Sequence, residues 1–185
     1  MSEVGTTLDL HATARRAGAA RWLDARLFEV LGGWVADEAD PEVKIAFATQ
    51  ASHHGWHAGL WGERLPTLHG VDPGSWVRPA SDGVEAAMAA LAGAPGSVER
   101  LAGVHRALLP RLSAAHAVHL EATSAVADAP TMRTLRLVLA DQDEDRRGGD
   151  RLLQGLLVGR DDVERAAVQV AALEWLLVQA GPLLG

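Results

Sequence analysis

The sequence contains no cysteine, tyrosine or asparagine, and its only lysine is Lys44. The absence of cysteine excludes disulfide bonds and thiolate metal sites, and it suits a reducing cytoplasm. No apolar run approaches the roughly 18 residues that a membrane-spanning helix needs. The segment 1–10 also lacks the basic and apolar regions of a secretory signal. We therefore expect a cytoplasmic protein with no membrane partner.

Basic residues are also scarce relative to acidic ones. The 17 lysine and arginine residues are outnumbered by 24 aspartate and glutamate residues, which gives a net charge of -7. This balance argues against a nucleic-acid partner. Hydrophobic residues make up 48% of the 185 residues and charged residues 22%, as is typical of a globular protein. We expect residues 1–185 to form a single domain.

Apolar residues at helical spacing and cap signals predict five long helices and no strand. The helix starts include Asp40-Pro41 and Asp128-Ala129-Pro130, while Asp161 or Asp162 is expected to cap the last helix. The predicted helices span about 10–36, 41–65, 97–123, 129–157 and 161–180, with a short helix around 84–91. We also expect a kink at Pro110 and a strained or frayed turn at Gly148-Gly149.

The lengths of the connections predict the topology. Short turns make antiparallel hairpins of the first two and the next two long helices. The crossover 67–96 is long enough to run back along the bundle, so the expected fold is an all-α four-helix bundle with a fifth, C-terminal helix. Simple up-down-up-down connectivity is the competing arrangement.

Polar residues fall on the inward faces of these helices. On helix 41–65, Gln50, His54 and His57 share one face, while His53 lies on a second face with Ile45, Thr49, Trp56 and Leu60. Because this helix is apolar nearly all round, we expect its neighbours to enclose it. The other inward polar residues are Asp24, His105, His116, His119, Gln142 and Arg146, with Asp145 at the flank.

The heights of these residues along the bundle can be compared by counting from the turns. If the crossover makes helices 41–65 and 97–123 parallel, His57 and His116 lie at nearly the same height. Asp24, Gln50 and Gln142 then lie within about two turns of them. The sequence therefore predicts a polar cluster in the middle of the bundle.

Over residues 10–157 the chain resembles the ferritin-like superfamily. It also looks like uncharacterised actinobacterial ferritin-like proteins in the run Leu-Phe-Glu-Val-Leu-Gly-Gly-Trp at 27–34 and in His-His-Gly-Trp-His at 53–57. Di-iron members of the superfamily carry a carboxylate on each of two helices and Glu-x-x-His on two others. Here Gln50 and Gln142 stand where glutamates are expected. Since a di-iron cluster needs several anionic oxygens, we expect no orthodox di-iron centre.

Two interpretations of the histidines remain. In one, they hold a single iron, zinc or copper ion, with ligands drawn from Asp24, His53, His54, His57, His116 and His119. In the other, no cofactor binds, and the histidines form hydrogen bonds in the core to Asp24, Gln50, Gln142, Asp145 and Arg146. A small-molecule pocket, with a ligand that the sequence does not specify, is a further alternative.

The functional expectations follow from these two interpretations. The chain is either a binding or interaction module with a degenerate metal centre, or a metal-dependent oxidoreductase or oxygenase with a histidine-rich site. The apolar helix 161–180 either forms part of a homodimer interface or covers the core of the monomer.

Overall fold

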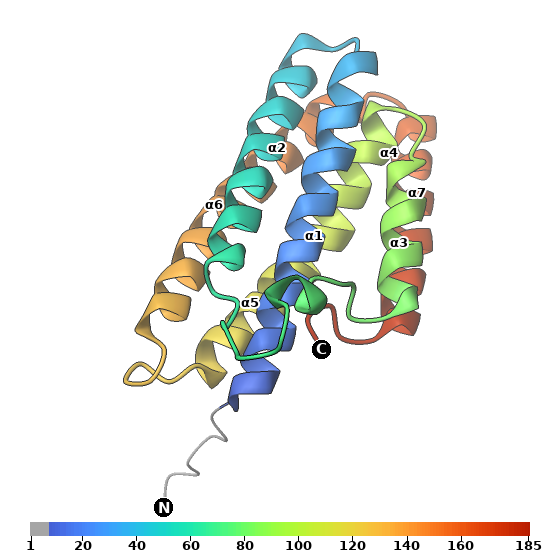
Figure 1. Cartoon of the computed structure of the whole chain (residues 1–185). Helices are drawn as coiled ribbons and strands as arrows, with labels where there is room; N and C mark the ends of the chain where they lie inside the picture. The colour runs from blue at the N-terminus through green and yellow to red at the C-terminus, as the bar shows by residue number, and fades with distance from the viewer. Residues whose placement is uncertain (1–7) are drawn as a thin grey trace, which may run out of the picture.

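The computed structural model describes residues 8–185, which form six helices packed as a bundle and contain no strand (Figure 1). The predicted all-α class is therefore confirmed for this part of the chain. The segment 1–10, in which we expect no signal peptide, lies mostly outside the described residues. No helix in the described part is both long enough and apolar enough to span a membrane.

The helix bounds lie within about one turn of the predicted ranges. The helices are α1 (Leu10–Asp37), α2 (Pro41–Gly62), α3 (Asp82–Ala92), one continuous helix made of α4 (Ser97–Ala102), η2 (Gly103–Leu108) and α5 (Leu109–Ala122), then α6 (Ala129–Leu156) and α7 (Arg160–Ala180). A single 3-10 turn, η1 (Pro73–Trp76), lies in the crossover.

Side-chain caps start most of these helices. The side chains of Asp9, Asp40 and Asp128 accept hydrogen bonds from backbone N–H groups in the first turns of α1, α2 and α6. α7 differs from the prediction because its N-cap is Gly159, whose N–H donates to the Asp162 carboxylate. The acidic residue thus stabilises the helix start from inside the first turn.

Contacts between α1 and the α4–η2–α5 helix show that the two run antiparallel. At one end the N–H of Leu8 donates to the carbonyl of Ala122. At the other end Ser97 Oγ donates to Glu38 Oε1. The two long helices therefore run in opposite directions, with the start of each near the end of the other.

α6 runs antiparallel both to α2 and to the α4–η2–α5 helix. Gln50 and His57 of α2 bond to Asp145 and Asp141 of α6 in reverse order. Arg106 and His116 bond to Asp150 and Gln142, again in reverse order. α2 and α4–η2–α5 are consequently parallel, and the crossover between them returns the chain along the bundle.

α3 and α7 pack side by side on the outside of the four long helices (Figure 1). Ser81, at the start of α3, donates from Oγ to the carbonyl of Ala180 at the end of α7. A Cβ at Gly83 would lie 2.8 Å from Cα of Ala180, so this glycine allows the two helices to approach closely. The C-terminal helix thus covers one side of the bundle.

One face of α2 is open, contrary to the expectation that neighbours enclose it. Ile45 is 66% exposed and Trp56 50% exposed, and Thr49 is exposed as well. Within residues 8–185, α2 packs mainly against α1 and α6, and these two helices leave its second face exposed. The expectation that this face of α2 is buried is therefore wrong, although the face carries apolar residues.

Of the two predicted irregularities, the one at Pro110 takes a different form and the one at Gly148-Gly149 is not found. The helix around Pro110 forms a π-helical turn in the preceding residues, Gly103–Leu108, where the N–H of Leu109 donates to the carbonyl of Val104. Proline has no N–H, and its ring would clash with a carbonyl one α-helical turn earlier, so a widened turn relieves both problems. The predicted strain or fraying at Gly148-Gly149 is wrong, because α6 is continuous through both residues.

Candidate metal centre

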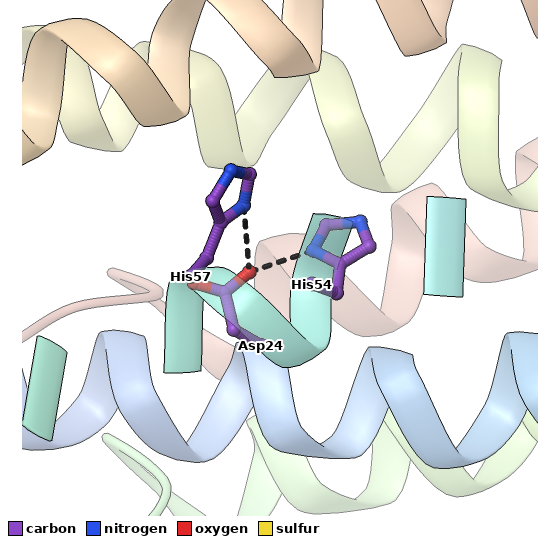
Figure 2. Close-up of side chains that lie close together, drawn as sticks. All are labelled: Asp24, His54 and His57. Carbon is purple, nitrogen blue, oxygen red and sulfur yellow. Dashed lines mark hydrogen bonds and ion pairs between the residues drawn. The ribbon is translucent and has the colours of Figure 1, made fainter. Parts of the chain in front are cut away.

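Asp24 of α1 and His54 and His57 of α2 meet inside the hairpin between these two helices (Figure 2). The spacing of three residues places both imidazoles on the same face of α2. Asp24 and His57 are 0% exposed and His54 is 1% exposed. Among residues 8–185, this is the one group of three or more candidate ligands, with one atom from each residue within 4.8 Å of the others.

The distances in this group are close to those around a bound metal ion. His54 Nδ1 lies 2.7 Å and His57 Nδ1 3.9 Å from Asp24 Oδ1. Two ligand atoms, each about 2.1 Å from one transition-metal ion, are separated by about 3 to 3.5 Å. Small side-chain rotations would therefore bring all three atoms to coordination distance.

Trp61 holds the second oxygen of Asp24. Its Nε1–H donates to Asp24 Oδ2 over 2.9 Å, and the indole is fully buried. Trp61 follows His54 and His57 on the same face of α2 at helical spacing, which the sequence shows. The sequence does not show that Trp61 bonds to Asp24 and does more than fill the core, because this depends on how α1 and α2 cross.

Asp141 of α6 orients His57 from the opposite side. His57 Nε2–H donates to Asp141 Oδ2 over 2.9 Å. A neutral imidazole that is protonated at Nε2 carries a lone pair at Nδ1, the atom that faces Asp24. A carboxylate on the outer nitrogen of a ligating histidine is a common feature of metal sites. The acidic run 141–145 in the sequence contains this residue, but its spacing did not single it out.

His54 has a free nitrogen that allows its proton to move. Its Nδ1–H donates to Asp24 Oδ1, while its Nε2 is buried without a partner in the described part of the chain. A tautomer with the proton on Nε2 would free Nδ1 to bind a metal. The hydrogen bond between His54 and Asp24 would be lost in exchange.

His116 and His119 contact Trp61 and do not join the group. Their rings stack on the indole, with centroids 5.5 Å and 6.1 Å away. His116 Nδ1–H donates to Gln142 Oε1, which also accepts from Ser113 Oγ. Burial lowers the pKa of His116, and burial together with the nearby charge of Arg16 lowers the pKa of His119 to about 3.

His105 is a buried histidine on the predicted inward face that is not one of the predicted ligands. It is 2% exposed, and neither ring nitrogen has a partner among residues 8–185. Burial lowers the pKa of this imidazole to about 3, so the side chain is neutral. It packs against Gly149 of α6, where a Cβ would lie 2.0 Å from His105 Nε2.

His53 and the remaining polar residues form a separate arrangement nearer the surface. His53 is partly exposed, and its Nδ1 lies 3.0 Å from Asp145 Oδ2. Burial raises the pKa of Asp145, and the hydrogen bond from His53 opposes that effect. Gln50 donates from Nε2 to the carbonyl of Asp145. Arg146 does not join a buried network; it is partly exposed and pairs with Asp143.

Comparison with known proteins assigns no family to this chain. The chain has no match among models of protein families and no significant match among curated proteins or solved structures. What the structure establishes is an all-helical bundle with a buried aspartate and two histidines that can hold a metal ion.

Proposed function

We propose that this protein is a ferritin-like bundle that binds one transition-metal ion at Asp24, His54 and His57, and that it acts as a binding module. The observation that carries the proposal is the burial of three candidate ligand atoms within 4.8 Å of one another. The helix directions support the ferritin-like part, because two antiparallel hairpins joined by a long crossover are typical of that bundle.

The donor set favours a single ion rather than two. One carboxylate and two imidazoles provide one negative charge, and imidazole suits iron, zinc and copper. A pair of multivalent ions needs several bridging anionic oxygens. The amides that replace the expected glutamates do not supply them: Gln50 donates to a backbone carbonyl and Gln142 accepts from Ser113 and His116.

An oxidoreductase is the second candidate, and the composition of the donor set favours it. Two histidines and one carboxylate, with other coordination positions open, are the ligands of many non-haem iron oxygenases. An absorbance change when the protein is mixed with Fe(II) under oxygen supports this candidate. No change in a protein that binds Fe(II) stoichiometrically contradicts it.

The proposal is tested by measuring the metal content of protein purified without a histidine tag. We expect about one iron, zinc or copper ion per chain in the wild-type protein, loss of the metal in His57→Ala, and retention in His116→Ala. His116 is the matched control because it is also fully buried but lies outside the group. Circular dichroism confirms that both variants are folded.

Two outcomes contradict the proposal. One is a metal-free wild-type protein that does not take up metal and whose melting temperature is unchanged by a chelator. The other is equal loss of metal in both variants, because only retention in His116→Ala ties the ion to the group of Asp24, His54 and His57.

A further inference from the structure

The buried group has no direct exposure to solvent, so an ion needs a route through the bundle. A groove of about 490 Å³ lies between α2 and α6, one to two turns from the group along α2. We call it the α2–α6 groove; its polar lining consists of Glu42, Thr49, Gln50, Glu144, Asp145 and Arg151. Three carboxylates against one guanidinium make the lining net negative, which attracts cations.

Gln50 connects the groove with the buried group. It lines the groove, is 4% exposed, and keeps its Oε1 buried without a partner among residues 8–185. An unpaired buried amide oxygen is costly, and a cation that moved inward from the groove would satisfy it. His54 lies four residues further along the same face of α2, and its Nε2 is also unpaired. Gln50 and His54 are thus successive residues on the face of α2 that runs from the groove to the candidate ligands.

Gly148 keeps the groove open. A Cβ at this position would meet only the end of the Arg151 side chain, at 4.0 Å. A side chain here would therefore extend into the space that the groove occupies. The neighbouring Gly149, in contrast, faces His105 in the interior.

We propose that the α2–α6 groove captures a divalent metal ion from solution and passes it by way of Gln50 and His54 to the buried group. This inference rests on the proposed function, because it supplies the route to the same site. The carboxylates of Glu42 and Glu144 provide the attraction at the exposed end of the groove, and the free oxygen of Gln50 provides the first buried ligand.

The test is the rate at which metal-free protein takes up Co²⁺, followed by visible absorption in a stopped-flow instrument at low ionic strength. The variant Glu42→Gln/Glu144→Gln is compared with the control Glu85→Gln/Glu121→Gln, which removes the same charge from elsewhere on the surface. Glu85 is a close match for Glu42, because each lies in the first turn of its helix and is exposed.

We expect about tenfold slower uptake in the groove variant, an unchanged rate in the control and the same final absorbance in both. The difference should largely vanish in 1 M salt, where the Debye length is about 3 Å. The uncharged change Gly148→Leu should also slow uptake, whereas Gly155→Leu, at an open and exposed position of α6, should not.

Each outcome bears on one proposal or on both. Full final absorbance with equal rates in the groove variant and its control overturns the route and leaves the metal site in place. Failure of the wild-type protein to bind Co²⁺ overturns the metal site and the route together.

Discussion

Asp24 is fully buried and accepts hydrogen bonds from two aromatic side chains of α2. His54 Nδ1 donates to one oxygen and Trp61 Nε1 to the other. A buried carboxylate needs such partners, because the loss of hydration is costly for a charge. At the scale of single residues, these two donors fix the orientation of Asp24 toward His57.

Replacing Trp61 by phenylalanine tests this arrangement. The smaller phenylalanine ring leaves part of the space of the indole empty, and Asp24 Oδ2 loses its donor, so we expect the free energy of unfolding to fall by about 2–4 kcal/mol. Urea unfolding measures the change. Trp56→Phe is the control: that side chain is 50% exposed, and the same substitution should change stability by less than about 0.5 kcal/mol. Equal effects of the two substitutions would contradict the role of the Trp61–Asp24 bond.

The sequence predicted which residues of α1 and α2 face inward, but not how side chains pair between helices. Helical spacing placed Asp24, His54 and His57 toward the interior. The roles of Trp61 and Asp141 depend on the crossing of α2 with α1 and α6, which periodicity within one helix does not contain. The sequence pattern therefore did not predict which atoms of these residues form hydrogen bonds.

At the scale of helices, the π-helical turn η2 and the glycine pair in α6 fit together. η2 contains His105, and Gly149 of α6 leaves the space that the imidazole occupies. Two glycines in sequence suggested a weak helix, since glycine has low helix propensity. The close approach of His105 explains Gly149, and α6 remains continuous because both neighbouring helices pack against it.

Gly149→Ala and Gly148→Ala should therefore have opposite effects on stability. A Cβ at position 149 would overlap His105, and we expect a loss of about 1–3 kcal/mol in the free energy of unfolding. A Cβ at position 148 meets open space, and the higher helix propensity of alanine should stabilise the protein by up to about 1 kcal/mol. Chemical denaturation of the two variants measures both values. A stable Gly149→Ala protein would show that His105 does not pack as described.

At the scale of the whole molecule, the buried histidines make stability depend on pH. His105 and His119 have pKa values of about 3 in the folded protein, against 6.5 for an ordinary histidine. Below pH 6.5 the unfolded chain binds protons at these residues and the folded chain does not, so acid favours unfolding. Burial lowers the pKa of His116 as well, which acts in the same direction. The raised pKa of Asp145 has the opposite effect.

We expect the metal-free protein to lose roughly 4 kcal/mol of stability between pH 7 and pH 5 from His105 and His119 together. Urea unfolding at several pH values measures this loss. The variant His105→Gln should show a shallower dependence, because one of the two groups has been removed. A free energy of unfolding that stays constant from pH 7 to pH 5 would mean that these histidines are hydrated or protonated in the folded state.

The overall arrangement was more predictable than the site. Cap residues and apolar spacing predicted the helix bounds, because both are properties of local sequence. The open face of α2 was not predicted, since the exposure of Ile45 and Trp56 depends on which helices are neighbours. Sequence spacing also does not show that His116 and His119 stack on Trp61 instead of joining Asp24, His54 and His57, because this depends on how α5 packs against α2.

The proposed function requires Asp24, His54 and His57 to hold one metal ion. The most direct test is an anomalous difference map of a crystal of the protein loaded with Zn²⁺, recorded at the zinc edge. We predict one peak inside the α1–α2 hairpin, about 2.0–2.2 Å from an oxygen of Asp24 and a nitrogen of each histidine. A map with no peak at this position, or with peaks only at surface residues such as His69, would contradict the claim.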